Sequence, residues 1–215
     1  MDVIGSHNTM SYLRPRRWWG RLLRVFARCQ TLSLDGQIKA GVRAFDLRIY
    51  RNRRTGEWLF AHGLVSFDTS ETLQTVISRI PAGAVVRIIL ERDRGDGIPF
   101  DVICFRMERD YPELTFIGGR RKRDWKQLHR FAGENRWPDS MVHQHVGSMA
   151  PDARWYEHLI PLLYARRVYG YRKTHRRHIL PDDSGDNTRN GNGDPGNPYT
   201  LPPLLPGINL FDFII

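Results

Sequence analysis

The chain has 215 residues, of which 40% are hydrophobic, so it can fill the core of one domain and is not a disordered protein. No apolar run approaches the roughly 20 residues that a membrane-spanning helix requires. The formal net charge is +10, and all but four of the 33 cationic residues are arginine, a side chain that contacts phosphate through two nitrogens at once. An anionic partner is therefore expected. Nucleic acid, an acidic membrane surface and a phosphorylated small molecule all fit this charge.

Short apolar runs predict buried strands that alternate with helices along the chain. The expected strands are 3–4, 41–49, 58–62, 84–91, 114–117, 141–146 and 208–215. The expected helices are 17–29, 70–79, 98–109 and 152–168, with Pro161 starting or kinking the last of them. Strands that alternate with helices in this way are typical of an α/β fold with a parallel sheet.

A single domain over residues 1–215 is expected. The segment 181–200 is dense in glycine, asparagine, aspartate and proline, and only about one strand follows it. It is therefore expected to be a mobile surface loop and not a linker between domains. Cys29 and Cys104 lack the spacing of a metal site and are expected to be buried thiols, with a disulfide left open.

The start of the chain bears on its location in the cell. Met1 is followed at once by Asp-Val-Ile-Gly, which does not resemble a signal peptide. A cytoplasmic or peripheral membrane protein is favoured, and secretion stays open if the natural chain begins earlier.

Three polar clusters end or interrupt apolar strands: residues 6–9 (Ser-His-Asn-Thr), Asp46 with Arg48, and His62. Each alone is also compatible with a structural role. Asp46 and Arg48 share a strand face with Ala44, so a charged pair would lie in an otherwise buried strand and need a partner or a chemical role. Two imidazoles and a guanidinium suit metal-free cleavage of a phosphodiester. One imidazole takes the proton of a nucleophilic hydroxyl, the other protonates the leaving oxygen, and the guanidinium stabilises the phosphoryl oxygens.

In this order and at these spacings, GSHNT, GQIKAGVRAFDLRI and FAHGL resemble the X-type catalytic region of phosphatidylinositol-specific phospholipases C. The resemblance runs from about Val3 to Glu91, and a final strand with Asp212 adds to it. It implies an irregular (β/α)8 barrel of the TIM type, compact or incomplete here, with its site at the C-terminal ends of the strands. It also implies a phosphoric diester hydrolase or lyase that converts phosphatidylinositol to diacylglycerol and a cyclic inositol phosphate.

The resemblance implies a role for each matched residue. His7 is the expected general base for the inositol 2-hydroxyl, and His62 is the expected general acid for the diacylglycerol oxygen. Arg48 matches the arginine that stands in place of calcium in the bacterial enzymes. Asp46 would orient Arg48, and Asp212 would hold His7 in the useful tautomer.

A calcium-dependent site is the alternative. Asn8, Asp46 and Glu91 match positions of the eukaryotic calcium-dependent branch and would supply three oxygen ligands. Arg48 stands where a fourth, acidic ligand is expected, and its fixed charge opposes a divalent ion. We therefore expect no cofactor, and we expect Glu91 to pair with Arg48 or Arg92.

Substrate-binding residues are less sharply indicated than catalytic ones. His143 and His145 alternate along a strand, so they face the same side and would contact phosphate or inositol hydroxyls. With Asn8 and Glu91 they form the candidate substrate-binding set. A polar strand end without function is the other reading, and a zinc pair would lack a third ligand at an informative spacing.

The segment 14–29 suggests a membrane interface. On a helical wheel its apolar residues, including Trp18 and Trp19, fall in one broad arc, and three arginines lie opposite. A basic amphipathic helix with paired tryptophans suits an anionic phospholipid surface. The other reading is a helix whose apolar face packs into the core, with its arginines in water.

Two other functions stay open. The first is a metal-dependent phosphodiesterase acting on a glycerophosphodiester or on sphingomyelin. Such enzymes generally hold their metal with a Glu-x-Asp pair, and the Asp46-x-Arg48 pair speaks against one. The second is an inactive basic protein that binds lipid or nucleic acid. The basic runs 120–123 and 172–177 are by default solvated charge, and no nucleic-acid fold motif accompanies them, so nucleic acid is not the expected partner.

Overall fold

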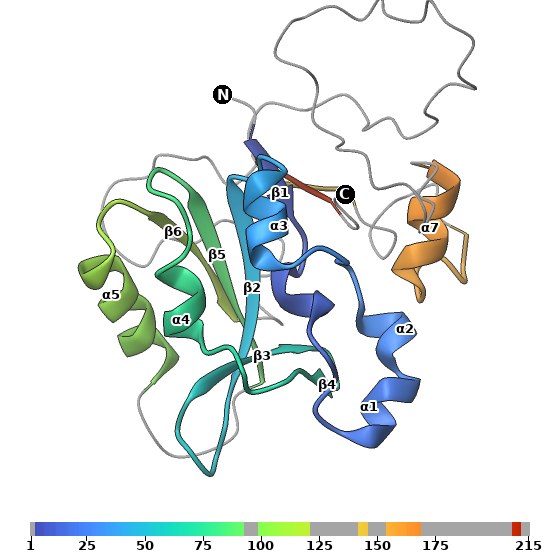
Figure 1. Cartoon of the computed structure of the whole chain (residues 1–215), viewed down its shortest axis with the longest axis horizontal. Helices are drawn as coiled ribbons and strands as arrows, with labels where there is room; N and C mark the ends of the chain where they lie inside the picture. The colour runs from blue at the N-terminus through green and yellow to red at the C-terminus, as the bar shows by residue number, and fades with distance from the viewer. Residues whose placement is uncertain (1–2, 93–98, 121–141, 146–153, 169–207, 212–215) are drawn as a thin grey trace, which may run out of the picture.

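The computed structural model describes residues 3–92, 99–120, 142–145, 154–168 and 208–211, and within them eight strands form one sheet (Figure 1). The strands are β1 (Val3–Ser6), β2 (Ala44–Arg51), β3 (Trp58–His62), β4 (Val65–Ser66), β5 (Val85–Arg92), β6 (Thr115–Arg120), β7 (Val142–His145) and β8 (Ile208–Phe211). The helices are η1 (Thr9–Tyr12, a 3-10 turn), α1 (Trp18–Leu22), α2 (Arg24–Ala27), α3 (Leu34–Lys39), α4 (Leu73–Ile77), α5 (Phe100–Asp110) and α7 (Pro161–Val168).

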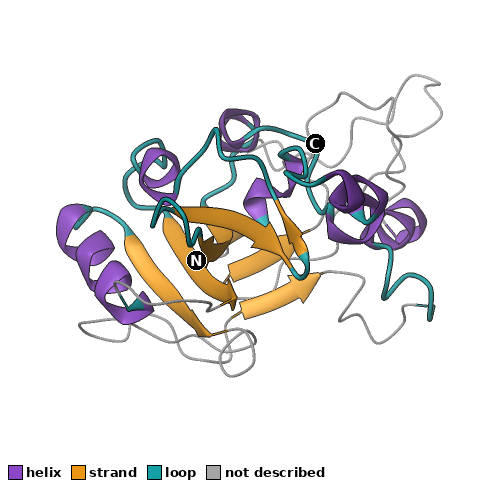
Figure 2. Ribbon diagram, turned by 90° about the horizontal axis from the view of Figure 1, so that it is seen from below, coloured by secondary structure: helices purple, strands orange, loops and turns teal. Residues whose placement is uncertain are grey.

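The sheet is mainly parallel, as expected for an α/β fold. Strands β7, β8, β1, β2, β5 and β6 are parallel neighbours in that order. Figure 2 shows these strands side by side, with the helices around their periphery. Within the described part of the chain no pairing joins β6 to β7, so the sheet is open there. The α/β class is confirmed, and closure into a complete barrel stays a prediction.

The hairpin of β2 and β3 departs from the expected parallel arrangement. β3 runs antiparallel to the end of β2, with Ile49 opposite Phe60, and β4 continues as a short antiparallel strand that was not expected. The cause is the tight connection between the two strands, in which the Asn52 amide donates to the Glu57 carbonyl at 2.8 Å. A connection this short can join only antiparallel strands.

The helices follow the expected pattern with several differences, and one of them is the 3-10 turn η1, which was not expected. The expected helix 17–29 is interrupted at Leu23 and forms α1 and α2. Helix α3 was not expected, although Ser33 caps it by accepting a hydrogen bond from the Gly36 amide at 3.2 Å. The expected helix 152–168 is helical only from Pro161 in α7, and residues 155–159 form turns, so Pro161 starts the helix, which was one of the two roles expected for it.

The two faces of β2 have different surroundings, because side chains alternate along a strand. Phe45, Leu47 and Ile49 are fully buried and belong to the main core cluster. Ala44, on the other face, belongs to a second apolar cluster drawn from four other strands as well. That cluster consists of Val3, Ala44, Val85, Ile117, Ile208 and Leu210. Asp46 follows Ala44 on this face, so the polar site is built next to an apolar base.

Several sequence-based expectations concern features outside the sheet. Cys29 and Cys104 are both buried and free, which confirms the expectation of buried thiols. The expected loop 181–200 and Asp212 lie outside the described residues. Of the helices that the structure describes, none is long and apolar enough to cross a bilayer.

Close packing of β1 against its neighbours generates a stability prediction. A Cβ atom added at Gly5 would lie 2.6 Å from Leu210 Cδ2 and 2.9 Å from Ala44 Cβ. Gly5→Ala should therefore lower the free energy of unfolding by about 1–3 kcal/mol, because strands β1, β2 and β8 would have to separate. Urea denaturation measures this change. Lys39→Ala, at an exposed position of α3, is the control and should be near neutral. Equal stability of Gly5→Ala and the wild type would contradict the packing described.

Candidate active site

The first polar cluster is a tight turn at the end of β1. Asn8 has φ 47° and ψ 56°, and within the described residues it is the one non-glycine residue with positive φ. Asparagine tolerates this left-handed conformation better than most residues. Thr9 Oγ1 lies 2.7 Å from Ser6 Oγ and donates to the Ser6 carbonyl at 3.1 Å, so hydroxyl groups brace both sides of the turn. His7, between them, is buried with 2% of its surface exposed.

A fully buried carboxylate, that of Asp46, connects the turn to the sheet. Its Oδ2 accepts from the Asn8 amide at 3.0 Å and from Arg48 Nε at 3.0 Å, and its Oδ1 accepts from Arg87 Nη1 at 3.2 Å. Burial alone would raise the pKa of Asp46, but the two guanidinium groups outweigh it and hold the pKa below its usual value. Asp46 is therefore ionised and orients Arg48, the arrangement that the sequence predicted.

The Arg48 guanidinium lies at the centre of the cluster. Besides Asp46, it donates from Nη1 to Glu91 Oε1 at 3.3 Å, which confirms the expected pairing of Glu91. Its Nη2 lies 2.6 Å from His7 Nε2. Burial acts to lower the pKa of Arg48, but Asp46 and then Glu91 reverse this effect and raise it, so the group remains a fixed positive charge.

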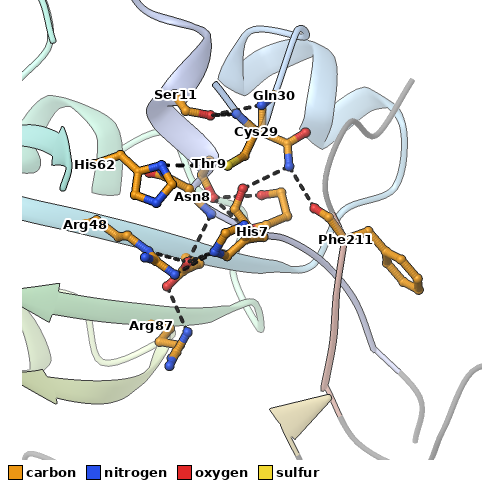
Figure 3. Close-up of polar contacts among 12 residues, drawn as sticks. His7, Asn8, Thr9, Ser11, Cys29, Gln30, Arg48, His62, Arg87 and Phe211 are labelled. Carbon is orange, nitrogen blue, oxygen red and sulfur yellow. Dashed lines mark hydrogen bonds and ion pairs between the residues drawn. The ribbon is translucent and has the colours of Figure 1, made fainter. Parts of the chain in front are cut away.

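His62, at the end of β3, faces the same space. Figure 3 shows its ring close to Arg48 and His7, and the ring centroids of the two histidines are 6.0 Å apart, nearly perpendicular. His62 Nδ1 lies 2.9 Å from the carbonyl oxygen of Ala27, which only accepts hydrogen bonds. Nδ1 therefore carries the proton, and Nε2 is the nitrogen of neutral His62 that can exchange one. Burial, followed by the charge of Arg48, lowers the pKa of His62 to about 3.

A second layer of polar contacts fixes the backbone around the histidines. Gln30 Nε2 donates to the His7 carbonyl at 2.9 Å and to the Phe211 carbonyl at 2.8 Å, so one side chain links the ends of β1 and β8. Ser11 Oγ accepts from the amides of Cys29 and Gln30, both at 2.9 Å. Cys29 Sγ lies 3.8 Å from His62 Nδ1. These contacts fix the segment after α2, residues Cys29 and Gln30, next to His7 and His62.

Two features of β5 contribute to the site, and the sequence analysis missed one of them. Arg87 is 2% exposed and contacts Asp46 across the strands. The sequence does indicate a role for Arg87, because a charged residue stands there within the apolar run AVVRIILE. The second feature is an irregularity in pairing: Ile49 lies opposite Leu90, but Tyr50 lies opposite Arg92. The extra residue, Glu91, is bulged and reaches Arg48.

Other predicted site residues are placed in part. His143 and His145 lie on β7, opposite Asn209 and Phe211 of β8, and only their backbone is described. Asp212, which follows Phe211, is outside the described residues. Asn8 is buried in the site, and its side-chain Nδ2 has no hydrogen-bond partner among the residues described.

The predicted membrane-interface segment is apolar and exposed. Trp18 is 74% exposed and Leu22 is 72% exposed, and Val25 and Phe26 are exposed as well. The reading in which this apolar face packs into the core is therefore wrong for these residues, because α1 and α2 turn it outward. Trp19, by contrast, is only partly exposed.

The proposed calcium ligands do not suit a calcium ion in this arrangement. Calcium takes roughly six to eight oxygen ligands. The carboxylates of Asp46 and Glu91 instead bind the Arg48 guanidinium, at 3.0 and 3.3 Å. A cation between these carboxylates would have to displace a side chain whose charge repels it.

The lowered pKa of His62 predicts a pH-dependent stability. The unfolded chain binds a proton to this residue below about pH 6.5, whereas the folded protein does so only near its pKa of about 3. Stability should therefore fall as the pH decreases from about 7 to about 5, a window in which Asp46 does not yet titrate. Thermal unfolding at each pH measures the effect.

His62→Asn provides the matched control for this titration. The asparagine amide can still donate to the Ala27 carbonyl, but it does not titrate. The melting temperature of this variant should depend less on pH than that of the wild type. The same dependence in both proteins would contradict a lowered pKa at His62.

Comparison with known proteins identifies relatives of part of this chain. No family model matches the chain. PI-PLC X domain-containing protein 3 of Mus musculus is 43% identical over 58 residues, which cover 26% of this chain and 18% of that protein. Its counterpart in Danio rerio is 32% identical over 80 residues, 36% of this chain and 25% of the relative. The chain thus matches a quarter or less of the length of these curated relatives.

Solved structures that the chain matches at low similarity carry a related name. Phosphatidylinositol-specific phospholipase C from Listeria monocytogenes has a TM-score of 0.42 and 18% identity, covering 66% of this chain and 62% of that one. A structure of the Staphylococcus aureus enzyme has a TM-score of 0.44 and 14% identity, covering 82% and 68%. The sequence motifs and the curated relatives together identify the matched part of the chain as a domain of the PI-PLC X type.

Proposed function

We propose that the chain is a phosphodiesterase that cleaves phosphatidylinositol-type lipids to diacylglycerol and a cyclic inositol phosphate, without a metal. The observation that carries this proposal is the convergence of His7, Arg48 and His62 in one site, with Asp46 fixing the guanidinium. Metal-free cleavage of a phosphodiester needs a general base, a general acid and a fixed positive charge beside the phosphate, and these three residues can supply them.

His7 is the general base in this mechanism. Arg48 Nη2 now donates to His7 Nε2, so Nε2 is an acceptor in the absence of substrate. An anionic phosphodiester attracts the guanidinium to its own oxygens, which leaves His7 Nε2 to accept the proton of the inositol 2-hydroxyl. That oxygen forms a bond to phosphorus, and the bond from phosphorus to the glycerol oxygen breaks.

His62 is the general acid. Because Nδ1 already holds a proton directed to the Ala27 carbonyl, the proton that His62 donates is a second one, taken up from solvent on Nε2 when substrate binds. The pKa of about 3 keeps His62 neutral in the free enzyme. A bound phosphodiester offsets the charge of Arg48 and so raises the affinity of His62 for the proton that it gives to the leaving oxygen. Asp212 is proposed, from the family resemblance, to hold His7 in its tautomer.

Metal independence belongs to this proposal. Arg48 supplies the positive charge that a calcium ion would otherwise supply, and Asp46 and Glu91 are its counter-ions. The same contacts disfavour the alternative of a metal-dependent glycerophosphodiesterase or sphingomyelinase. The Asp46 carboxylate is already neutralised by its ion pair with Arg48 and so does not need a metal ion. A non-catalytic lipid-binding or nucleic-acid-binding protein is the other alternative, and an activity assay separates it.

The exposed face of α1 and α2 is the proposed contact with an anionic phospholipid membrane. Trp18 and Leu22 present apolar surface to solvent, and Arg16, Arg17 and Arg21 beside them are exposed. Tryptophan favours the head-group zone, and exposed cations are attracted to acidic lipid. This combination of charge and apolar area favours a membrane over a neutral protein partner.

The central test is turnover of phosphatidylinositol in mixed micelles with EGTA present. The wild type should release diacylglycerol and a cyclic inositol phosphate. His7→Ala and His62→Ala should each lower turnover by at least about 100-fold, because each removes a proton-transfer group. Product analysis by phosphorus NMR measures this.

His158→Ala is the matched control, because His158 is exposed and lies away from the site residues in sequence. It should keep wild-type turnover. Activity that is lost in EGTA and restored by calcium would contradict the metal-free mechanism. A folded His62→Ala variant with full activity would remove His62 as the acid.

If α1 and α2 contact the membrane, substitutions there should weaken vesicle binding without changing hydrolysis of a soluble substrate. Trp18→Ala with Leu22→Ala should weaken binding to vesicles of phosphatidylcholine and phosphatidylinositol by at least about tenfold, because exposed apolar area is lost. Hydrolysis of soluble inositol 1,2-cyclic phosphate should be unchanged. Phe105→Ala, at a 58% exposed position of α5, is the control and should bind vesicles normally. Equal losses on vesicles and on the soluble substrate would argue for a structural role.

A further inference from the structure

Gln30 joins two strands at the point where their regular pairing ends. Strand β1 ends at Ser6, which lies opposite Phe211, the last residue of β8. One residue further, Gln30 Nε2 donates to the His7 carbonyl at 2.9 Å and to the Phe211 carbonyl at 2.8 Å, as Figure 3 shows. The His7 amide donates to the same Phe211 carbonyl at 2.9 Å. The backbone of His7 is therefore held at both its amide and its carbonyl.

Gln30 is itself held firmly in place. It is fully buried, its amide donates to Ser11 Oγ at 2.9 Å, and its carbonyl accepts from Arg28 Nε at 3.1 Å. Ser11 lies in η1, the turn of helix that follows His7 in the chain. A supporting side chain whose own position is set by packing and hydrogen bonds can fix the direction of a functional group. Gln30 meets this condition for His7.

The role of His7 makes the direction of its ring important. Arg48 Nη2 donates to His7 Nε2, so Nε2 of the neutral ring is the acceptor and Nδ1 carries the proton. A general base must present its unprotonated nitrogen within hydrogen-bond reach of the hydroxyl that it deprotonates. A turned ring or an exchanged tautomer would present the wrong nitrogen. The backbone from which the ring projects is therefore part of the mechanism.

We propose that Gln30 is a positioning residue for the general base. Its amide keeps the carbonyls of His7 and Phe211 together, so that His7 projects in the direction and the tautomer that proton transfer requires. Phe211 also directly precedes Asp212, the residue proposed to hold the His7 tautomer, so the same amide fixes the backbone just before it. The inference rests on the proposed function, because it assigns Gln30 to a proton transfer by His7.

Gln37 makes the same kind of contact without reaching His7. It is also fully buried, and its Nε2 donates to the carbonyls of Thr9 and Leu32, both at 2.9 Å. Each of these two glutamines thus uses one nitrogen to satisfy two carbonyl oxygens. Because only the bonds of Gln30 include the His7 carbonyl, the pair separates a positioning role from a contribution to stability.

Turnover of phosphatidylinositol in mixed micelles tests the proposal. Gln30→Met keeps the length of the side chain but removes its amide. The kcat should fall by about tenfold to 100-fold, because a proton-transfer group that is displaced by up to about 1 Å loses this much. The KM should change by less than about threefold, since Gln30 acts through His7 and not on substrate binding.

Gln37→Met is the matched control. Both variants should lower the melting temperature by similar amounts, on the order of 5 °C, because each leaves two carbonyls without the same kind of donor. Gln37→Met should nevertheless keep its kcat within about threefold of the wild type. An equal loss of kcat in the two variants would mean that turnover follows stability and would overturn the proposal.

A double-mutant cycle tests whether Gln30 acts through His7. Residues that act as one unit have non-additive effects on turnover. In the His7→Ala background, Gln30→Met should therefore lower the remaining kcat by less than about twofold. The full loss in that background would place the effect of Gln30 elsewhere and would overturn the proposal.

Nitrogen NMR of the isotope-labelled protein tests the contact without substrate. At about pH 8, above the ordinary pKa of histidine, the wild type should show one neutral tautomer of His7 with the proton on Nδ1. The signal is assigned by its loss in His7→Ala. Gln30→Met should show both tautomers in exchange, and Gln37→Met should show one. A wild-type ring without a preferred tautomer, or a Gln30→Met ring that keeps it, would contradict the positioning role.

These measurements separate this inference from the proposed function. A wild type that cleaves no lipid would contradict the proposed enzyme, and the spectra would still decide whether Gln30 orients His7. Lipid cleavage with unchanged kcat in a folded Gln30→Met would overturn this inference and leave the enzyme standing. If Gln30→Met does not fold, Ser11→Ala replaces it, because it removes the acceptor of the Gln30 amide. Its kcat should fall at least about threefold, and an unchanged kcat would count against the proposal.

Discussion

The rest of the site depends on the burial of Asp46 between two arginines. Removing a carboxylate from water costs on the order of several kcal/mol unless partners compensate, and Asp46 has Arg48, Arg87 and the Asn8 amide as partners. With Glu91, the two guanidinium groups and two carboxylates balance in charge. Because the carboxylate holds Arg48 by Nε, the two terminal nitrogens of the guanidinium point to Glu91 and His7. The direction of the Arg48 guanidinium is therefore a property of the buried ion cluster and not of the solvent-facing loops.

That ion cluster is stable at this place because side chains alternate between the two faces of β2 and β5. The inner face begins with small and branched apolar residues, such as Ala44 and Val85, which pack against each other between strands. One step along, Asp46 and Arg87 lie opposite each other in the register, so oppositely charged groups meet over an apolar base. The outer residues of the same strands, Phe45 and Val86 among them, fill the main core. A shift of one residue in the pairing of β2 and β5 would exchange these faces and destroy both core and site.

How much of this was predictable varies with the kind of interaction. Periodicity identified the strands and the shared face of Asp46 and Arg48, because a strand shows its two faces in its sequence. Arg87 obeys the same logic and could have been found. The contact of His62 with the Ala27 carbonyl could not, because a backbone acceptor has no sequence signature. The same holds for Gln30, whose two bonds join segments that only the complete fold brings together. The antiparallel β3 required knowledge of the short turn at Asn52, which strand propensity alone does not give.

Helix α1 lies between an exposed apolar face and a pocket lined by six arginines. Trp18 points to solvent on the face proposed to meet the membrane, whereas its neighbour Trp19 lines the basic pocket. Adjacent helical residues project about 100° apart, so a single turn of helix borders both the exposed apolar face and this pocket. The five residues of α1 therefore place Trp18 toward solvent and Trp19 against the arginine-lined pocket, and the bend at Leu23 keeps Val25 and Phe26 of α2 exposed beside them.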